Sequence, residues 1–207
     1  VCFARSRYQQ HLIPDAVRPI CAYNTINVTL DNSIMRKAKS FCVVTPTVSE
    51  YKDFIIHMFQ KLRYSDKKAT LDIFTDYEAL KKDKELFELT KRKYITVHRE
   101  FGRSEIIRQL QVSSFSVFLD EPGKSVRSHV HDIREAGAYG CLPVLGINGA
   151  SKECMGIHLD KSDHPKSVQI MQTIMKDKER MMALRKQIME GDYSWSNTEK
   201  LWTEHLL

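Results

Sequence analysis

Short apolar runs alternate with amphipathic stretches along most of this chain, and the alternation predicts strands and helices in turn. The predicted strands are rich in β-branched and aromatic residues; they cover residues 20–23, 39–44, 69–74, 94–97, 115–119, 141–146 and 156–159. The predicted helices present an apolar face; they cover residues 3–12, a stretch capped by Ser49, residues 77–90, a stretch capped by Ser104, residues 131–140, 163–176 and 177–190, and a last helix through Trp202. This order of elements predicts an α/β fold with a parallel sheet flanked by helices.

Residues 114–148 hold the clearest run of elements. A buried strand is predicted at 115–119, and a polar loop follows from 120 to 129. A helix then opens at His131 and Asp132 and ends at Gly140, before the next strand, where Pro143 is tolerated near the start. The loop therefore lies at the carboxyl end of a strand, where open α/β sheets bind ligands. The helix directs its free N–H groups and positive dipole end toward the same crevice.

Composition is ordinary for a globular protein, with 42% hydrophobic and 28% charged residues among 207. The net charge of +6 suits a polyanionic partner, namely a nucleotide diphosphate, an anionic membrane face or nucleic acid. A solvated basic surface is the simpler interpretation of so modest a charge. The same holds for the basic groups at 81–84 and 91–93, for which contact with a membrane or a partner domain is the alternative. No aromatics interleave with a basic stripe, so no specific nucleic-acid partner is expected.

Cysteine usage and the lack of long apolar runs suggest a location. The five cysteines are widely scattered, without CxxC or zinc-type spacing, which indicates free thiols and a reducing compartment. No apolar run is long enough to cross a bilayer and no signal peptide is recognisable, so we expect no transmembrane segment and a cytoplasmic protein. Because the first residue is Val, we expect a piece of a longer polypeptide.

Several short motifs, taken in their order and spacing, resemble one family. The run REAGAYGCLPV at 134–144 is similar to its E-A-x-A-x-G-x-P-V motif, and SEYKD at 49–53 resembles its loop with a phosphate-binding Lys. Residues 101–103 (FGR) resemble the loop beside the nucleobase, and residues 192–196 (DYSWS) the segment before the closing helix. Residues 4–6 and 23–27 resemble its interdomain link. Together they resemble the C-terminal, donor-binding half of a GT-B glycosyltransferase, of the retaining group 1, family four type.

The resemblance implies a Rossmann-like three-layer domain at residues 39–207. Residues 1–38 would be the end of the N-terminal GT-B half and the interdomain link. Two departures stand out. The family has two Glu separated by seven residues; Glu135 matches the second, but Arg127 stands at the first. An Arg that precedes the phosphate Lys is replaced by Thr47. Donor binding is therefore implied more firmly than turnover.

The implied catalytic residues are Glu135, Lys52 and Arg127. Breaking the anomeric bond puts negative charge on the departing diphosphate, which cations such as Lys52 and Arg127 would stabilise. A carboxylate accepts two hydrogen bonds, so Glu135 fits the two vicinal hydroxyls of a ribose. The implied donor-binding residues are Phe101, Gly102, Arg103, Ser128, His129, His131 and Glu135. Judged without the resemblance, Lys52 and Arg127 are ordinary surface cations, the histidines are cap or surface residues, and Glu135 is one half of a helix-face pair.

The expected function is transfer of a hexosyl or deoxyhexosyl unit from a nucleotide-diphosphate sugar, with a UDP-sugar as the first candidate. The acceptor would be a glycan, a lipid or a protein-linked group, and the anomeric configuration would be retained. Neither an Asp-x-Asp pair nor a metal cluster is visible, so no metal cofactor is expected. The partners would be the sugar nucleotide, the acceptor and other domains of the same polypeptide. The alternatives are a non-catalytic sugar-nucleotide-binding module, a nucleic-acid-binding domain and a GT-B-fold epimerase.

Overall fold

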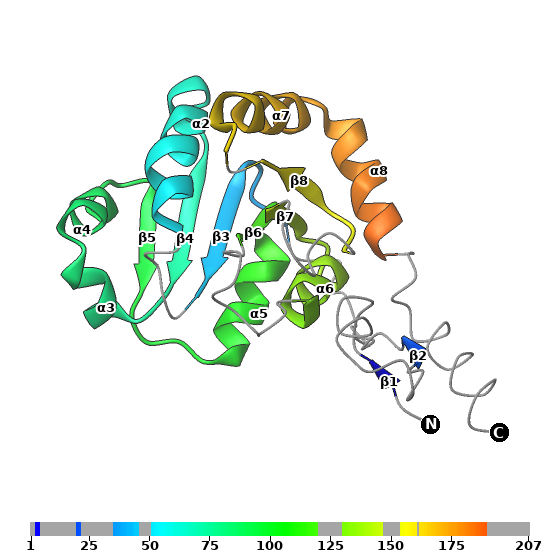
Figure 1. Cartoon of the computed structure of the whole chain (residues 1–207), viewed down its shortest axis with the longest axis horizontal. Helices are drawn as coiled ribbons and strands as arrows, with labels where there is room; N and C mark the ends of the chain where they lie inside the picture. Colours follow the sequence, from blue (N-terminus) through cyan, green and yellow to red (C-terminus); the bar gives the residue numbers. More distant parts are fainter. Residues whose placement is uncertain are drawn as a thin grey trace.

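A six-stranded, entirely parallel sheet forms the centre of the molecule (Figure 1). The structure is a computed structural model, and it describes residues 3–4, 20–21, 35–45, 51–119, 130–146, 154–160 and 162–189. The strands run in the order β5-β4-β3-β6-β7-β8. Their bounds are β3 (Ser40–Val44), β4 (Thr70–Phe74), β5 (Ile95–His98), β6 (Phe115–Phe118), β7 (Leu142–Gly146) and β8 (Ile157–Leu159). The predicted parallel α/β sheet is confirmed.

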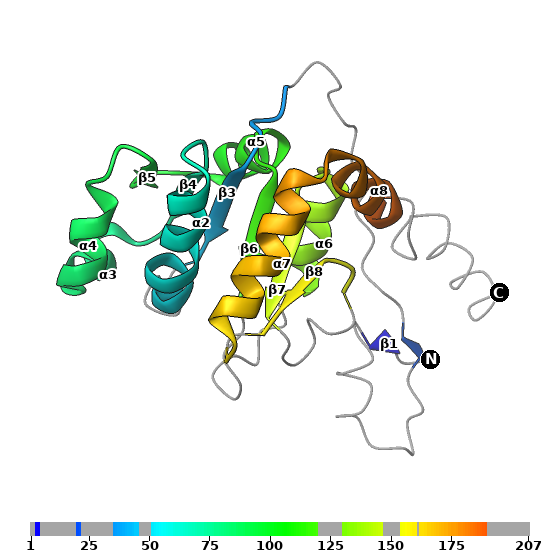
Figure 2. The same ribbon diagram turned by 90° about the horizontal axis from the view of Figure 1, so that it is seen from above.

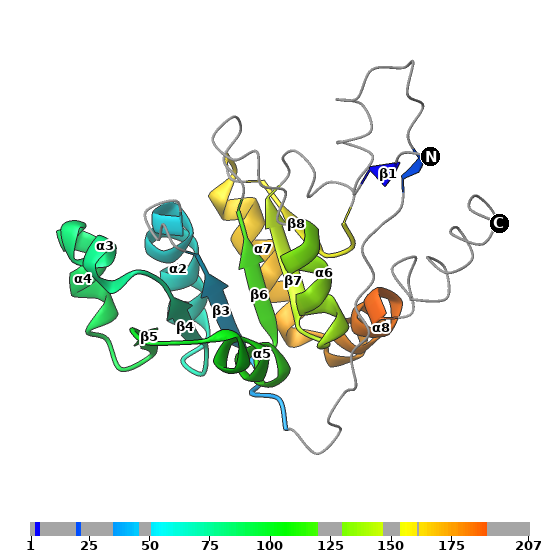
Figure 3. The same cartoon turned by 90° about the horizontal axis from the view of Figure 1, so that it is seen from below.

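Helices cover both faces of this sheet (Figures 2 and 3). On one face lie the π-helical segment η3 (Phe54–Phe59), its continuation α2 (Gln60–Ser65), and α7 (His164–Lys176). On the other lie α5 (Arg103–Val112) and α6 (Val130–Ala138). Two short helices, α3 (Tyr77–Lys82) and α4 (Lys84–Thr90), connect β4 to β5, and α8 (Lys178–Met189) packs against α6 and β7. The result is the three-layer arrangement that the sequence predicted.

Alternate residues of the strands enter two separate cores. In β3, Phe41 and Val43 belong to the large core under η3 and α7, whereas Cys42 belongs to the smaller core under α5 and α6. Phe41 stacks on Phe115 of the neighbouring strand, with ring centroids 4.8 Å apart. Since both faces are covered, the strands are apolar on both sides, and this explains their nearly continuous hydrophobic runs.

Three predicted helices differ in the structure. Of the predicted helix 3–12, Phe3–Ala4 instead form β1, which pairs in parallel with β2 (Ile20–Cys21), and residues 5–12 lie outside the described residues. The predicted helix 77–90 is interrupted at Asp83, whose carboxylate accepts the Leu86 N–H and whose own backbone is extended. The predicted cap Ser104 lies inside α5, because Gly102 is the N-cap.

Other predictions cannot be compared with the structure. Ser49, the predicted cap of the helix after β3, and the last helix through Trp202 lie outside the described residues. The same is true of the segment 192–196. The predicted division between residues 38 and 39 stays a prediction, although β3 begins close to it at Ser40.

A half-buried arginine connects the two helices of one face at the amino edge of the sheet. Arg36 donates to the carbonyl oxygens of Leu110 and Ser113, 3.0 and 2.9 Å away, at the end of α5. It also donates to the carbonyl of Tyr139, at the end of α6. Gly140 ends α6 with φ +73°, as predicted, and a Cβ there would lie 2.6 Å from the Arg36 guanidinium. Arg36 therefore satisfies helix-end carbonyls that would otherwise lack partners.

We expect Arg36→Lys to lower the free energy of unfolding by about 2–4 kcal/mol, because an ammonium cannot reach three carbonyls at once and charged hydrogen bonds are lost. Urea denaturation followed by circular dichroism measures the change. The matched control is Lys37→Ala, an exposed neighbour, for which we expect a change within about 0.5 kcal/mol. Equal stability of Arg36→Lys and the wild type would contradict this role.

Candidate functional site

An open groove lies at the carboxyl edge of the sheet, where β3, β4 and β5 end. Its volume is about 910 Å³. The residues that line it are Val44, Thr45, Phe74, Thr75, Asp76, Tyr77, Glu78, Arg99, Glu100 and Phe101. All of them belong to strand ends or to the first residues after a strand, which is where open parallel sheets place their ligands. The groove combines an aromatic floor with charged groups of both signs.

Stacked rings form the floor. Phe74 lies flat against the His98 imidazole, with centroids 4.0 Å apart and an interplanar angle of 2°. Phe101 meets Phe74 edge-to-face, with centroids 5.3 Å apart. The imidazole Nε2 of His98 is 2.9 Å from Oδ1 of Asp72, a nearly buried carboxylate on β4. This ion-pair geometry fixes the His98 ring, and the fixed ring in turn supports the two phenylalanines.

The wall on the α3 side carries the charges. The Arg99 guanidinium lies over the ring of Tyr77, 3.9 Å from its centroid. Asp76 caps α3 by accepting the backbone N–H groups of Glu78 and Ala79. A cation held on an aromatic face is positioned with little loss of freedom on binding. Arg99 is therefore a candidate ligand-contacting cation that the sequence did not single out.

Glu135 of α6 lies beside the loop that closes one side of the groove. Its side chain is 8% exposed, and Oε1 is 2.5 Å from Nη2 of Arg103, whose own side chain is 68% exposed. Arg103 begins α5, two residues after Phe101 of the groove. Three residues that the family resemblance grouped together, Phe101, Arg103 and Glu135, are thus linked in space through one loop and one ion pair.

Gly102 shapes this loop. Its N–H donates to Oε2 of Glu105 at 2.9 Å, and a Cβ at this position would lie 3.1 Å from that same oxygen. The hydroxyl of Ser104 and the N–H groups around it lower the pKa of Glu105, so the carboxylate stays charged at the positive end of α5. The loop that carries Phe101 and Arg103 is therefore fixed at its helical end.

Lys52, the predicted diphosphate ligand, pairs with two carboxylates. Its ammonium is 2.9 Å from Oε2 of Glu85 and 3.1 Å from Oδ2 of Asp83, and both carboxylates come from the α3–α4 connection. The Glu85 carboxylate, followed by Asp83, raises the pKa of Lys52. Within the described residues Lys52 does not line the groove. Its assignment to the diphosphate stays a prediction.

The remaining predicted residues lie in the least described part of the chain. Arg127, Ser128 and His129 fall outside the described residues. His131 is placed only as backbone in the first turn of α6. Among the described residues, no group of three or more His, Cys, Asp or Glu could hold a metal ion. In the same residues, no helix is long and apolar enough to cross a membrane.

Sequence reasoning missed most of the groove lining. Phe74 ends β4 and Asp76 and Tyr77 come just after it, while Arg99 directly follows β5. The available signal was their place at the carboxyl ends of predicted parallel strands. That rule was applied only to the loop after the strand at 115–119.

Comparison with known proteins identifies the fold. No protein-family model matches the sequence, and no curated protein matches it. Among solved structures, a GtfA/B complex matches 99% of this chain with a TM-score of 0.72 and 13% identity. The pneumococcal O-GlcNAc transferase GtfA in complex with UDP and GlcNAc matches 98%, with a TM-score of 0.70 and 15% identity. The catalytic domain of Arabidopsis thaliana starch synthase IV, bound to ADP and acarbose, matches 84%, with a TM-score of 0.55 and 13% identity.

At these identities the similarity establishes the fold. The chain has the Rossmann-like architecture of one half of a GT-B glycosyltransferase, and the predicted fold class is confirmed. It spans 44% of the length of each of the first two matching chains and 39% of the third. The retaining subtype stays a prediction.

We expect the ion pairs of Lys52 to hold η3 against the α3–α4 connection. Although burial alone would raise the pKa of Asp83, the Leu86 N–H and the Lys52 ammonium outweigh it and lower that pKa. A lowered carboxylate pKa stabilises the fold above the unfolded pKa, and the contribution is lost as pH falls through the folded pKa. Lys52→Ala should therefore lower the unfolding free energy near pH 7 and lower it much less near pH 3, where the carboxylates are protonated.

Urea denaturation at both pH values measures this difference. Lys61→Ala, an exposed lysine on α2, is the matched control and should have no effect at either pH. If Lys52→Ala is as stable as the wild type near neutral pH, the two ion pairs contribute nothing and Lys52 is free to serve a ligand.

Proposed function

We propose that this chain is the donor-binding half of a glycosyltransferase. It binds a nucleotide-diphosphate sugar and contributes to transfer of the hexosyl or deoxyhexosyl unit to a glycan, lipid or protein-linked acceptor. Two findings support the proposal: the GT-B-type fold, and the position of Glu135 beside the groove at the carboxyl edge. The matched GtfA structure contains UDP and GlcNAc, so UDP-sugars are the first donors to test.

The contact that carries the proposal is the one between Glu135 and Arg103. A carboxylate that is almost buried beside the groove, with a mostly exposed arginine as its partner, is suited to exchange that partner for ligand hydroxyls. When the donor binds, the two ribose hydroxyls donate to Glu135 and Arg103 turns toward the solvent-facing side of the ligand. The floor formed by the edge-to-face rings of Phe74 and Phe101 offers an apolar surface to the base.

The chemical step needs stabilisation of the leaving group. The bond between the anomeric carbon and the diphosphate oxygen breaks, and negative charge develops on the diphosphate. Backbone N–H groups in the first turn of α6 face the carboxyl edge and stabilise an anion there. Arg127 supplies a further cation in this proposal, and Lys52 does so if the diphosphate replaces Glu85 and Asp83 as its partner.

The anomeric configuration is retained if the acceptor attacks the anomeric carbon from the same face of the sugar ring from which the diphosphate departs. The acceptor hydroxyl forms the new bond to the anomeric carbon, and its proton passes to an oxygen of the departing diphosphate. This route needs neither a protein nucleophile nor a metal ion. His129, Ser128 and His131 orient the donor sugar in this scheme by hydrogen bonds.

The acceptor site belongs to another part of the protein in this proposal. The chain spans less than half of the matched glycosyltransferases, so a second domain of the same polypeptide would supply the acceptor-binding half. We also propose a cytoplasmic location. The free thiols of Cys42 and Cys141 in the described residues are in accord with a reducing compartment.

We expect UDP-sugars to raise the melting temperature of the wild-type chain, and Glu135→Gln to weaken their binding by about 10- to 100-fold. The amide keeps the size of the side chain but loses one acceptor and the charge, which costs about 1.5–3 kcal/mol. Titration calorimetry with UDP gives the dissociation constants. Glu179→Gln, an exposed residue of α8, is the control and should bind like the wild type. The proposal fails if UDP, GDP and dTDP sugars all leave the melting temperature unchanged.

A non-catalytic sugar-nucleotide-binding module is the second candidate function. The two carboxylates on Lys52 favour it, because they neutralise the cation that the resemblance assigns to the diphosphate. Arg127 in place of a Glu favours it as well. We expect the two candidates to differ in hydrolysis of a bound UDP-sugar. Released UDP, measured by a coupled assay with and without acceptors, indicates an enzyme; tight UDP binding without any release indicates a binding module.

A further inference from the structure

Exposed basic residues gather at the amino edge of the sheet, opposite the groove. They lie on the three loops that enter β3, β4 and β5, and we call them the basic edge: Lys37, Lys67, Lys68, Arg92 and Lys93. Strand register places these loops side by side, since Ser40 is opposite Thr70 and Leu71 is opposite Ile95. With strands about 5 Å apart, the three loops lie within about 10 Å of one another. That is close to the screening length in physiological salt, so their charges act together.

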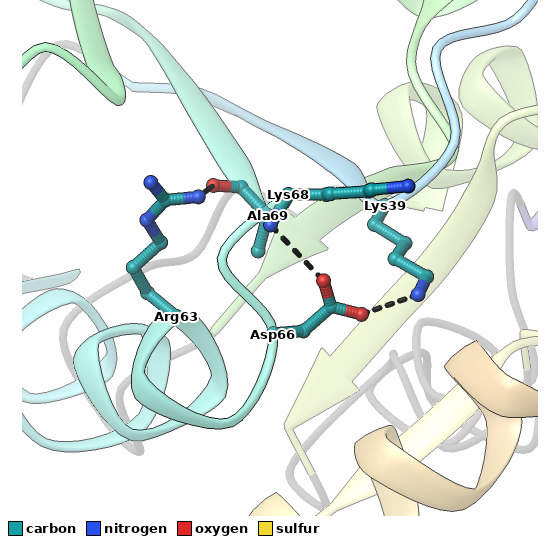
Figure 4. A network of polar contacts seen from close by, with 5 residues as sticks. All are labelled: Lys39, Arg63, Asp66, Lys68 and Ala69. Atoms are coloured by element: carbon teal, nitrogen blue, oxygen red, sulfur yellow. Dashed lines mark hydrogen bonds and ion pairs between the residues drawn. The ribbon is translucent and has the colours of Figure 1, made fainter.

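The positive charge of the basic edge is not neutralised within the described residues. Two neighbouring lysines do have carboxylate partners: Lys39 binds Asp66, and Lys91 binds Glu88. Figure 4 shows that Asp66 binds Lys39 and the backbone N–H of Lys68, while the Lys68 ammonium itself forms no ion pair with that carboxylate. Lys39 first, and then the Lys68 N–H, lower the pKa of Asp66, so this carboxylate remains ionised in its structural role.

Two large apolar side chains project from the same edge. Tyr64, in the last turn of α2, is 81% exposed, and Met35, just before Lys37, is 88% exposed. The ammonium of Lys67 lies 4.7 Å from the centroid of the Tyr64 ring. Lysines attract anionic headgroups, while tyrosine and other amphipathic side chains settle at the headgroup level of a bilayer. The combination suits a charged interface that also accepts apolar groups.

We propose that the basic edge, with Met35 and Tyr64, docks this domain peripherally on an anionic lipid bilayer. A phosphate surface with an apolar layer beneath it accommodates both kinds of side chain, whereas a nucleic-acid backbone offers Met35 no apolar environment. The groove lies at the opposite edge of the sheet, so docking leaves it open to solvent. The inference depends only on this surface and is independent of the proposed sugar transfer.

Co-sedimentation of the full chain with lipid vesicles tests the proposal. We expect binding to phosphatidylcholine vesicles that contain phosphatidylglycerol, no binding to pure phosphatidylcholine, and release by added salt. Each basic residue near an anionic surface is worth about fivefold in affinity, so the double variants Lys67→Glu/Lys68→Glu and Arg92→Glu/Lys93→Glu should each bind at least about tenfold more weakly. Tyr64→Ser should weaken binding as well, by loss of its interfacial contact.

The matched control is Lys82→Glu/Lys84→Glu, which has the same charge change on exposed residues. Lys84 begins α4, so it lies a helix length of about 10 Å from the amino edge. Since that distance is about one screening length, we expect this control to lose clearly less affinity than either edge variant, with thermal melting to show that every variant is folded. The proposal is overturned if the wild type ignores anionic vesicles at low salt, if the control loses as much affinity as the edge variants, or if single- or double-stranded oligonucleotides bind more tightly than vesicles.

Discussion

The reversal of strand order between β3 and β6 is the constraint on which the site depends. The chain builds β3, β4 and β5 outward in one direction, and α5 then returns it to the other side of β3 for β6, β7 and β8. The loops that follow β3 and β6 run in opposite directions from this point. The carboxyl ends of all six parallel strands lie at the same edge of the sheet. Since helices bury both faces of the sheet, polar side chains can meet a ligand only at the strand ends. The Arg103–Glu135 pair joins α5 and α6, the helices before and after β6 in the chain, and the groove lies beside this pair at the ends of β3, β4 and β5.

Glu135, Arg103 and Lys52 have intramolecular partners that a ligand must replace or share. Glu135 is nearly buried, and a buried carboxylate without a partner would be costly, so Arg103 stabilises the fold until ligand hydroxyls take its place. Because Arg103 is mostly exposed, replacing it by ligand hydroxyls costs little free energy. Lys52 has two carboxylates and is therefore harder to recruit. On this electrostatic ground, recognition of the ribose is better supported than contact of Lys52 with the diphosphate.

Patterns in the sequence predicted the sheet well because buried parallel strands are continuous apolar runs, as in Phe41–Val43 and Val117–Phe118. Gly140 was predictable because a positive φ favours glycine. The break at Asp83 and the cap at Gly102 were missed, since both depend on single hydrogen bonds to nearby N–H groups. The partner of Glu135 could not be read from the sequence either. Arg103 is 32 residues away, and only the fold brings α5 and α6 together.

Hydrogen–deuterium exchange of the full chain with and without UDP tests the central claim most directly, because it locates the binding site without assuming a reaction. The account predicts slower exchange at the loop before α5, which contains Phe101 and Arg103, and in the first turn of α6, with little change at the amino edge that carries Arg92 and Lys93. Protection confined to the amino edge, or tight binding of UDP without protection of the α5 loop and α6, would contradict the account.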